Sequence, residues 1–439
     1  MFFAIFMPSY KIQGGYKLKG EISVGLGKNS PVALLCATLL LKAKTHFKEM
    51  PKVEEVFRMI EILESVGVKV GWGEDQSLVV DTSMKLDLKK INKKVCRATR
   101  VSLLLLGALA AREKSYRLYK SGGCKLGSRT VKPHTLALEK FGIRVQSKAE
   151  FYEVHNQPLK SAHVVMYESG DTPTENAIMA AVLAKGITTI KMASANYMVQ
   201  DLCYFLVSAG ASIHGIGTTT LVIEGGKKLH GVQNYSIIPD PVDAMAWISL
   251  AVTTKSNITI KNCPLEFLEL ELEKLCVMGQ KFRIEKKRKS KSGFFDIGDI
   301  VIETSRLKAL PDKIYGRPFP GLNIDSLPFF VPIATQAKGQ TLIHDWPYEN
   351  RAVYGLEFQK LGVNVMLMDP HRLLVQGPAK LKPNDIECPP AIRPGMAILI
   401  AMIAAKGNSI LRNVYPIERA YENVMERLHG LGVHIQREE

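Results

Sequence analysis

One short segment recurs six times along this chain, and this repetition limits the folds open to it. Each copy combines the end of a helical stretch, a glycine and a short alternating strand, as in ILESVGVKV and LHGLGVHI. The glycines are Gly67, Gly142, Gly210, Gly279, Gly362 and Gly432, separated by 75, 68, 69, 83 and 70 residues. Glycine after a helix is typical of the left-handed C′ position, so each marker is predicted to end a helix.

A second element recurs between the markers: an apolar, alanine-rich helix, a polar turn and a β-branched strand. Examples are NAIMAAVLAKGITTIKMA and GMAILIAMIAAKGNSILRN. Helices that are apolar on all sides are predicted to be buried. Six such units exceed one core of usual size, so we expect three plus three, with a break near Ile237–Asp243 and a ligand cleft between two similar lobes.

The chain is basic, with 58 Lys and Arg against 42 Asp and Glu among 439 residues, a formal charge of +16. Such an excess favours an anionic substrate, nucleic acid or a membrane surface as partner. The longest apolar stretches, Val101–Ala111 and Gly395–Ala405, are too short to span a bilayer, which takes about 20 residues. The first residues lack a basic signal-peptide region, and no two of the seven cysteines form C-x-x-C. A cytoplasmic protein with reduced cysteines and no bound metal is expected.

The segment at 120–134, KSGGCKLGSRTVKPH, is the richest in candidate chemistry. Three glycines around Cys124 predict a loop that can close over a site. Lys120, Lys125 and Arg129 would lower the pKa of the thiol and attract anions. From the residues alone, Cys124 is either a reactive thiol or a loop residue without chemistry.

Lys28, in GLGKNSPVALL, precedes a predicted buried helix that Asn29 or Ser30 could cap. A lysine beside a helix N-terminus suits a phosphate or carboxylate, although an exposed lysine in a capping turn explains the pattern equally. The segment does not match G-x-x-x-x-G-K-[ST], which disfavours P-loop nucleotide hydrolysis.

Four arginines border the apolar helices: Arg100, Arg351, Arg393 and Arg419. Singly, each could be a surface or capping residue. Because they occupy comparable ends of repeated units, they could also converge on one cleft. Asp325, in PFPGLNIDSLPFF, is either an N-cap or a general base.

These motifs resemble the enolpyruvyl transferase superfamily, most closely its UDP-N-acetylglucosamine branch, over nearly the whole chain from Tyr16 to Gln436. SGGCKLGSRTVKPH is similar to the family's PGGCxIGxRPVDLH loop, and GKNSPVALLCATLL to GAKNAALPILAATLL. TENAIMAAVLAKG, YENR and YPIERAYENVMERLHGLG match TENxMMAAVLAxG, FENR and YHIDRGYERIxxKLxxLG.

The resemblance implies an α/β fold of a particular kind, a two-lobed inverse (inside-out) α/β barrel. Each lobe would contain three βαβαββ repeats. One lobe would comprise residues 1–27 with 239–439. The other would comprise 28–238 and carry the Cys124 loop at about 119–134.

The implied reaction transfers the enolpyruvyl group of phosphoenolpyruvate to a sugar hydroxyl of UDP-N-acetylglucosamine with release of phosphate, a step of peptidoglycan synthesis. By resemblance, Cys124 is the general acid and the target of fosfomycin, and Asp325 takes or orients the hydroxyl proton. Asn29 matches the family's Asn beside the Lys, and Thr130 and Val131 match the loop that touches the uridine. His134 matches a loop residue to which we assign no role. The family's cationic shell is matched by Lys28, Arg100, Arg129, Arg351, Arg393 and Arg419.

No cofactor, metal or membrane is implied, and a monomer or weak homo-oligomer is expected. Segments on the acceptor side depart from the family: Lys132 replaces an acidic residue, Gly170–Thr174 replaces SVGAT, 239–245 replaces PDRIExGT, and Ala391 replaces an Asp. A related transferase with another nucleotide or sugar acceptor is therefore one alternative. A second is a non-catalytic nucleic-acid or regulatory binder using Lys85–Arg97 and Lys281–Lys291, although these segments lack interleaved aromatic residues. The basic run 286–292 is otherwise expected to be an exposed hairpin or loop.

Overall fold

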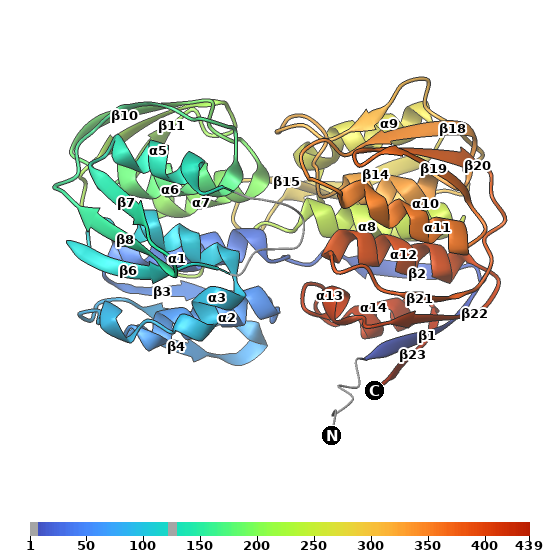
Figure 1. Ribbon diagram of the computed structural model, residues 1–439, viewed down its shortest axis with the longest axis horizontal. Helices are drawn as coiled ribbons and strands as arrows, with labels where there is room; N and C mark the ends of the chain where they lie inside the picture. The colour runs from blue at the N-terminus through green and yellow to red at the C-terminus, as the bar shows by residue number, and fades with distance from the viewer. Residues whose placement is uncertain (1–7, 122–129) are drawn as a thin grey trace.

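The computed structural model describes residues 8–121 and 130–439, which form two bodies side by side (Figure 1). Their buried apolar side chains fall into two clusters. One cluster draws on residues 10–24 and 242–435, and we call its body the terminal lobe because both described chain ends belong to it. The other draws on residues 32–238 with Phe267 and Phe295, and we call its body the central lobe.

The terminal lobe contains three sheets in the described part of the chain. One has the order β21 (Asp385–Glu387), β22 (Gly407–Arg412), β1 (Ser9–Gly14) and β23 (His434–Glu438). The second has β14 (Phe282–Lys289), β15 (Asp296–Ile302), β13 (Asn257–Pro264) and β2 (Lys19–Ser23). The third has β16 (Leu307–Lys308), β18 (Ala337–His344), β20 (Arg372–Gly377) and β19 (Asn364–Asp369), with β17 (Ile314–Tyr315) pairing to β18.

Three more sheets lie in the central lobe, over its described residues. The first two have three strands each: β3 (Lys44–Phe47), β5 (Leu78–Asp81) and β4 (Lys69–Trp72), then β6 (Ser115–Tyr119), β8 (Phe151–Asn156) and β7 (Ile143–Ser147). The third has the order β11 (Ser212–His214), β12 (Thr220–Gly225), β10 (Gly186–Lys191) and β9 (His163–Val165). The α/β class predicted from the sequence is confirmed.

The predicted apolar helices lie inside the lobes. Their exposed fractions are close to zero along most of their length, which suits helices with no polar face. They are α1 (Asn29–Leu41), η3 (Arg100–Leu104) with α4 (Leu105–Ala108), α6 (Asp171–Ala181), α8 (Pro241–Thr253), η5 (Leu327–Phe329) with α10 (Phe330–Ala334), and α12 (Ile392–Ala404).

A second helix of each repeat ends near its marker glycine. These helices are α2 (Glu54–Ser65), α5 (Lys132–Glu139), α7 (Tyr197–Ser208), α9 (Glu269–Val277), α11 (Glu357–Lys360), which follows η6 (Arg351–Leu356), and α14 (Val424–Gly430). All six marker glycines have positive φ, between 80° and 103°. The prediction that they occupy the left-handed region is confirmed, and a side chain there would strain the backbone.

The chain crosses between the lobes at 24–28 and again at 238–241, because β2 and α8 belong to the terminal lobe and α1 to the central lobe. The basic run 286–292 lies in the hairpin of β14 and β15, as predicted. Beyond this run, however, Phe294 stacks on Tyr204 of the central lobe with ring centroids 4.5 Å apart. The hairpin therefore also holds the two lobes together.

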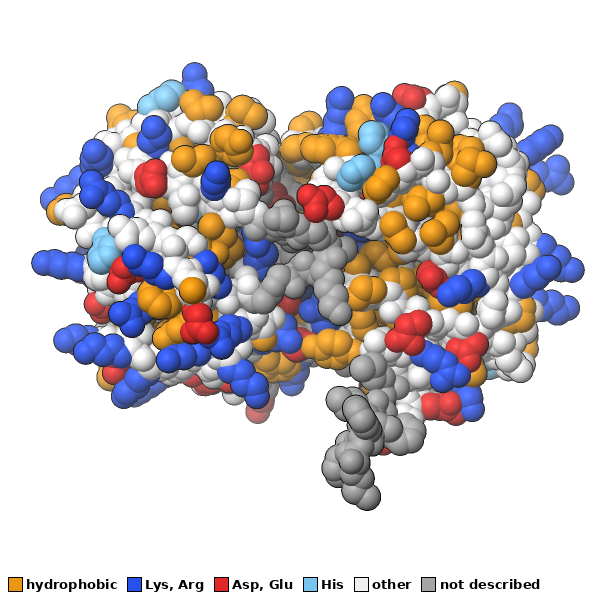
Figure 2. All heavy atoms as spheres, in the orientation of Figure 1, with side chains coloured by type: hydrophobic (Ala, Val, Ile, Leu, Met, Phe, Trp, Pro, Cys, Tyr) orange, Lys and Arg blue, Asp and Glu red, His pale blue; other side chains and the backbone are white. Residues whose placement is uncertain are grey.

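Lys and Arg side chains stand out along the outer margins of both lobes, and the surface is indented where the lobes meet (Figure 2). Among the residues described, no helix has the length and apolar character needed to cross a membrane.

Candidate active site

A pocket lies where the two lobes meet, and residues of both lobes line it. Val53 comes from the central lobe, whereas Asp240, Arg393 and Tyr421 come from the terminal lobe. The crossing segment at Gly25–Gly27 closes one side. Buried charged side chains therefore surround a space between two bodies, which is a common position for a ligand site.

Asp325 lies at this boundary between two guanidinium groups. Its carboxylate is 3.5 Å from an Nη atom of Arg351 and 3.8 Å from Nε of Arg393. The alternative that Asp325 is the N-cap of a helix is wrong, because the N-cap position of η5 is occupied by Ser326. Asp325 keeps 27% of its side chain exposed, so its carboxylate is fixed in position and still accessible to a bound hydroxyl group.

Arg351 is buried in the terminal lobe and held by several partners. It donates two hydrogen bonds to Asp345 and one of 2.6 Å to the carbonyl of Ile324, and it lies 4.1 Å from the ring centroid of Tyr348. Burial raises the pKa of Asp345, and the positive charge of Arg351 opposes that rise. This bidentate pair fixes the guanidinium before any substrate arrives.

Arg393 occupies the first turn of α12 and is also buried. Its guanidinium lies 3.9 Å from Asp240 and 5.3 Å from the ring centroid of Tyr421. Asp240 caps α8 by accepting a 2.9 Å hydrogen bond from the backbone of Val242, and burial raises its pKa to about 6. Asp240, Arg393, Asp325, Arg351 and Asp345 thus form a row of alternating charges.

Lys28 faces this row from the start of α1. Burial lowers the pKa of Lys28, and the nearby charges of Arg393 and Arg419 act in the same direction. The charges of Glu55 and Asp325 raise it. The predicted capping by Asn29 or Ser30 is wrong, because both lie inside the helix and neither side chain caps it.

The two residues after Lys28 instead bind other groups of the central lobe. Nδ2 of Asn29 donates a 3.3 Å hydrogen bond to the hydroxyl of Tyr197, and the hydroxyl of Ser30 donates to Asp201. These bonds fix the beginning of α1, and with it the position of Lys28.

Arg419 reaches the same boundary from the terminal lobe. One of its Nη atoms is 3.7 Å from Glu55 of the central lobe. Its Nε atom is buried and has no hydrogen-bond partner. A buried donor without a partner costs free energy unless a ligand oxygen accepts from it, so this atom favours an anion at the boundary.

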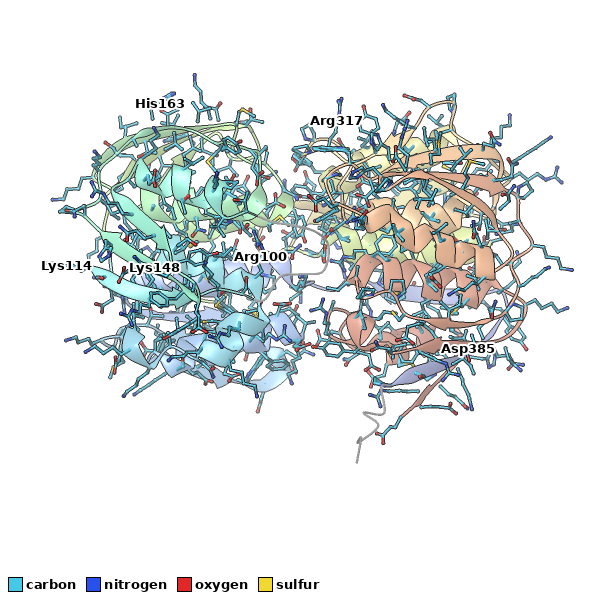
Figure 3. All side chains as sticks on the ribbon, viewed as in Figure 1. Arg100, Lys114, Lys148, His163, Arg317 and Asp385 are labelled. Atoms are coloured by element: carbon cyan, nitrogen blue, oxygen red, sulfur yellow. The ribbon has the colours of Figure 1, made fainter. Side chains whose placement is uncertain are left out.

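Arg100 lies on the side of the central lobe that faces the terminal lobe, whereas Lys114, Lys148 and His163 lie farther out (Figure 3). Its guanidinium donates a 3.1 Å hydrogen bond to the carbonyl of Thr130. Arg100 thereby contacts the chain directly after the segment 122–129.

His134 is buried in α5, close to Arg100. Its Nδ1 is 2.8 Å from Nδ2 of Asn176, and its Nε2 is 3.5 Å from the hydroxyl of Thr172. Burial, with a smaller contribution from Arg100, lowers the pKa of His134 to about 3. A neutral ring with these partners positions α5 against α6, and Val131, just before α5, packs against the central core.

Cys124 and Arg129 lie outside the described residues, so their assignments remain predictions from the sequence. The described residues contain no group of three or more His, Cys, Asp or Glu arranged to hold a metal ion.

Several residues of the site were not predicted from the sequence. Glu55, Asp240, Asp345 and Tyr197 all contact predicted site residues, yet each has an ordinary local sequence. The one available signal was Asp240 in the Pro-rich break at 237–243, where the chain was expected to change lobes.

The arrangement suits an anion with more than one negative charge beside a hydroxyl-bearing molecule. Lys28, Arg351, Arg393 and Arg419 supply fixed positive charges, and Asp325 supplies a carboxylate next to two of them. Fixed cations of this kind stabilise developing negative charge without rearranging during a reaction.

Comparison with known proteins agrees with this chemistry. The family model of EPSP synthase (3-phosphoshikimate 1-carboxyvinyltransferase) matches residues 12–428. The chain is 34% identical to the UDP-N-acetylglucosamine 1-carboxyvinyltransferase of Bacteroides thetaiotaomicron, over 98% of this chain and 100% of that relative. It is 33% identical to the protein of the same name from Treponema denticola, over 99% of this chain and 100% of that relative.

Two solved structures show the same fold. The enolpyruvyl transferase NikO from Streptomyces tendae superposes with a TM-score of 0.85 at 23% identity, covering 98% of this chain and 99% of that chain. EPSP synthase from Acinetobacter baumannii superposes with a TM-score of 0.79 at 18% identity, covering 98% of this chain and 100% of that chain.

Proposed function

Because the chain belongs to the EPSP synthase family of enolpyruvyl transferases, we propose that it transfers the enolpyruvyl group of phosphoenolpyruvate to a hydroxyl of UDP-N-acetylglucosamine. Phosphate is the second product, and the reaction supplies a precursor of peptidoglycan. The acceptor is proposed from the name that full-length relatives share. The observation that carries the chemistry is the position of Asp325 between Arg351 and Arg393.

The reaction needs a base for the acceptor hydroxyl that attacks one carbon of phosphoenolpyruvate, and an acid that protonates the neighbouring carbon. Asp325 accepts the proton of the acceptor hydroxyl while the hydroxyl oxygen forms a bond to the phosphate-bearing carbon of phosphoenolpyruvate. Cys124 donates a proton to the methylene carbon, which becomes a methyl group, and a tetrahedral intermediate forms. The Cys124 thiolate then takes a proton back from that methyl group, the carbon–oxygen bond to phosphate breaks, and the double bond forms again. The departing phosphate takes the proton held by Asp325, so both side chains return to their starting states.

The cations bind the substrate and stabilise the charge that moves during the reaction. Arg393 and Arg351 flank Asp325, so an anion bound to them lies beside the base. Lys28 and the unpartnered Nε of Arg419 provide further contacts for phosphate oxygens. We assign Arg129 and Arg100 to the same shell, with Asn29, Thr130 and Val131 on the acceptor side.

We further propose that the two lobes form the inverse α/β barrel of this family, divided into 1–27 with 239–439 and 28–238. The two hydrophobic clusters and the three sheets in each lobe support this division.

A second candidate is the same transfer to a different nucleotide or sugar. The observation in its favour is Asp171, the first residue of α6, within the segment that replaces SVGAT. Its carboxylate accepts hydrogen bonds of 2.6 Å from Ser194 and 3.2 Å from Asn196, and burial raises its pKa. A carboxylate at a helix N-terminus disfavours an anionic group there, which would alter how a diphosphate is bound.

An acceptor panel separates the two candidates. Phosphate release from phosphoenolpyruvate is measured with UDP-N-acetylglucosamine, with 3-phosphoshikimate, with other nucleotides and with no acceptor, and products are examined for a carboxyvinyl mass gain. Release that needs UDP-N-acetylglucosamine supports the first candidate, and release with another acceptor alone supports the second. Fosfomycin should inactivate the protein, and Cys124→Asp should resist it. If none of the acceptors in the panel supports phosphate release, both candidates are contradicted.

A further inference from the structure

Glu55 carries a buried negative charge at the boundary between the lobes. It lies in the first turn of α2, and only 7% of the residue is exposed. Its carboxylate accepts a hydrogen bond from the hydroxyl of Thr99 and lies 3.7 Å from the guanidinium of Arg58, both within the central lobe. The Oε1 atom of Glu55, which faces Arg58, is also 3.7 Å from the guanidinium of Arg419 in the terminal lobe.

This ion pair crosses between the two lobes. In the described chain, Glu55 is the sole carboxylate that pairs with Arg419. The backbone supports the contact, since the amide of Glu54 donates a 3.2 Å hydrogen bond to the carbonyl of Arg419. Arg419 therefore keeps its place beside the anion site only while the central lobe is close to it.

Glu55 also faces Lys28, whose other charged neighbours are Arg393, Asp325 and Arg419. Two of these neighbours are positive, so the ammonium group depends on nearby carboxylates to remain charged. Asp325 is already placed between Arg351 and Arg393, which leaves Glu55 as the carboxylate shared by Lys28 and Arg419.

We propose that Glu55 is a positioning residue for the enolpyruvyl transfer: from across the lobe boundary its carboxylate fixes the guanidinium of Arg419 beside Lys28, so that both cations meet the anionic substrate in one arrangement. The inference rests on the proposed function, and it assigns Glu55 no contact with the reacting atoms. If Glu55 has this role, Arg419 and Lys28 are correctly placed only when the two lobes are in contact.

Glu55→Gln tests the proposal by removing the charge and keeping the shape. We expect kcat to fall by about tenfold to a hundredfold, because two cations lose their fixed positions, while the KM for phosphoenolpyruvate changes much less. The basic limb of the pH profile should move to lower pH by roughly one unit, because Lys28 loses a stabilising negative charge. Glu55→Asp should restore most of kcat and return the basic limb of the pH profile close to its wild-type position.

Matched variants separate positioning from a loss of folding. Glu54→Gln alters the adjacent carboxylate, which binds Tyr415 and Arg58, and it should leave the basic limb in place. If Glu55→Gln does not fold, Thr99→Val removes the hydroxyl that holds Glu55 and should produce the same changes at smaller size. Circular dichroism melts of every variant report on folding.

Binding of inorganic phosphate, followed by calorimetry between about pH 6 and 10, gives a measurement that does not need turnover. We expect the wild type to bind phosphate to higher pH than Glu55→Gln. If the wild type binds phosphate but releases none from phosphoenolpyruvate, the proposed function fails and the binding curves still decide the role of Glu55. A Glu55→Gln variant that folds and matches the wild type in kcat and in both pH profiles would overturn the inference.

Discussion

Two groups of charges meet at the lobe boundary, and they are built differently. The row formed by Asp240, Arg393, Asp325, Arg351 and Asp345 belongs to the terminal lobe and to the crossing segment that enters it. The pair of Glu55 and Arg419 instead joins the two lobes. The first group is assembled whenever the terminal lobe is folded, whereas the second exists only when the lobes are in contact. The first group can therefore be formed by one lobe alone, whereas the second needs both lobes.

The largest expected effect lies in the row. Asp325→Asn keeps the size of the side chain but cannot accept the hydroxyl proton, so kcat for phosphate release should fall by about a hundredfold to ten-thousandfold. The free energy of unfolding should change little, because 27% of the Asp325 side chain is exposed. Phosphate-release kinetics and urea unfolding are the two measurements. Near-normal activity in Asp325→Asn would show that Asp325 is not the base and that the row only binds the substrate.

The second prediction compares one arginine from each group by stability: the buried Arg351 and the partly exposed Arg419. Arg351→Met leaves Asp345 buried without its bidentate partner and should lower the free energy of unfolding by about 3–5 kcal/mol. Arg419→Met should cost roughly half of that or less, since Glu55 keeps Thr99 and Arg58 as partners. Urea unfolding of both variants provides the comparison.

A double variant tests whether the loss of stability in Arg351→Met comes from the unpaired buried charge of Asp345. Asp345→Asn combined with Arg351→Met removes the buried charge, and it should recover part of the lost stability. Equal losses for Arg351→Met and Arg419→Met would contradict the distinction between the two groups.

The third prediction concerns the pH dependence of the row. Burial raises the pKa of Asp240 to about 6, so between about pH 4 and 6 the folded protein holds a proton that the unfolded chain has released. The Asp240 contribution to stability is complete below about pH 4 and is lost as the pH rises through 6, by up to about 3 kcal/mol.

Asp240→Asn should remove this part of the slope, which is measured by urea unfolding at several pH values. Asp385→Asn, at an exposed carboxylate paired with Arg412, is the control and should leave the curve unchanged. A curve for Asp240→Asn that runs parallel to the wild type between pH 4 and 6 would show that Asp240 does not titrate there.

The difference between the two groups also explains what the sequence could predict. The marker glycines and the apolar helices were predictable because their signals are local: a glycine after a helix, and a helix without a polar face. Asp325 and the arginines could be selected because they recur at the ends of those helices. Their convergence was predicted as a possibility, and Arg351 and Arg393 do lie together, because both contact Asp325.

The partners of these residues were not predictable in the same way. Glu55 and Arg419 are separated by 364 positions, and Glu55 lies in the first turn of an ordinary amphipathic helix. The stacking of Phe294 on Tyr204 is equally remote in sequence, so the hairpin was predicted but its contact with the other lobe was not. Contacts between lobes depend on how two folded bodies meet, and a single sequence carries no local signal for that.

The smallest effect is expected for the exposed hydrogen bonds that the Tyr415 hydroxyl makes between the lobes. Tyr415→Phe removes a hydroxyl that donates to Glu54 at 2.7 and 2.6 Å and accepts from Arg58 at 3.2 Å. Tyr415 is 45% exposed, so we expect a loss of less than about 1 kcal/mol in stability and a change of less than about threefold in kcat/KM. Small-angle scattering should find the same radius of gyration as in the wild type. A tenfold loss of activity with unchanged stability would mean that the hydroxyl of Tyr415, and not the carboxylate of Glu55, holds Arg419 at the boundary.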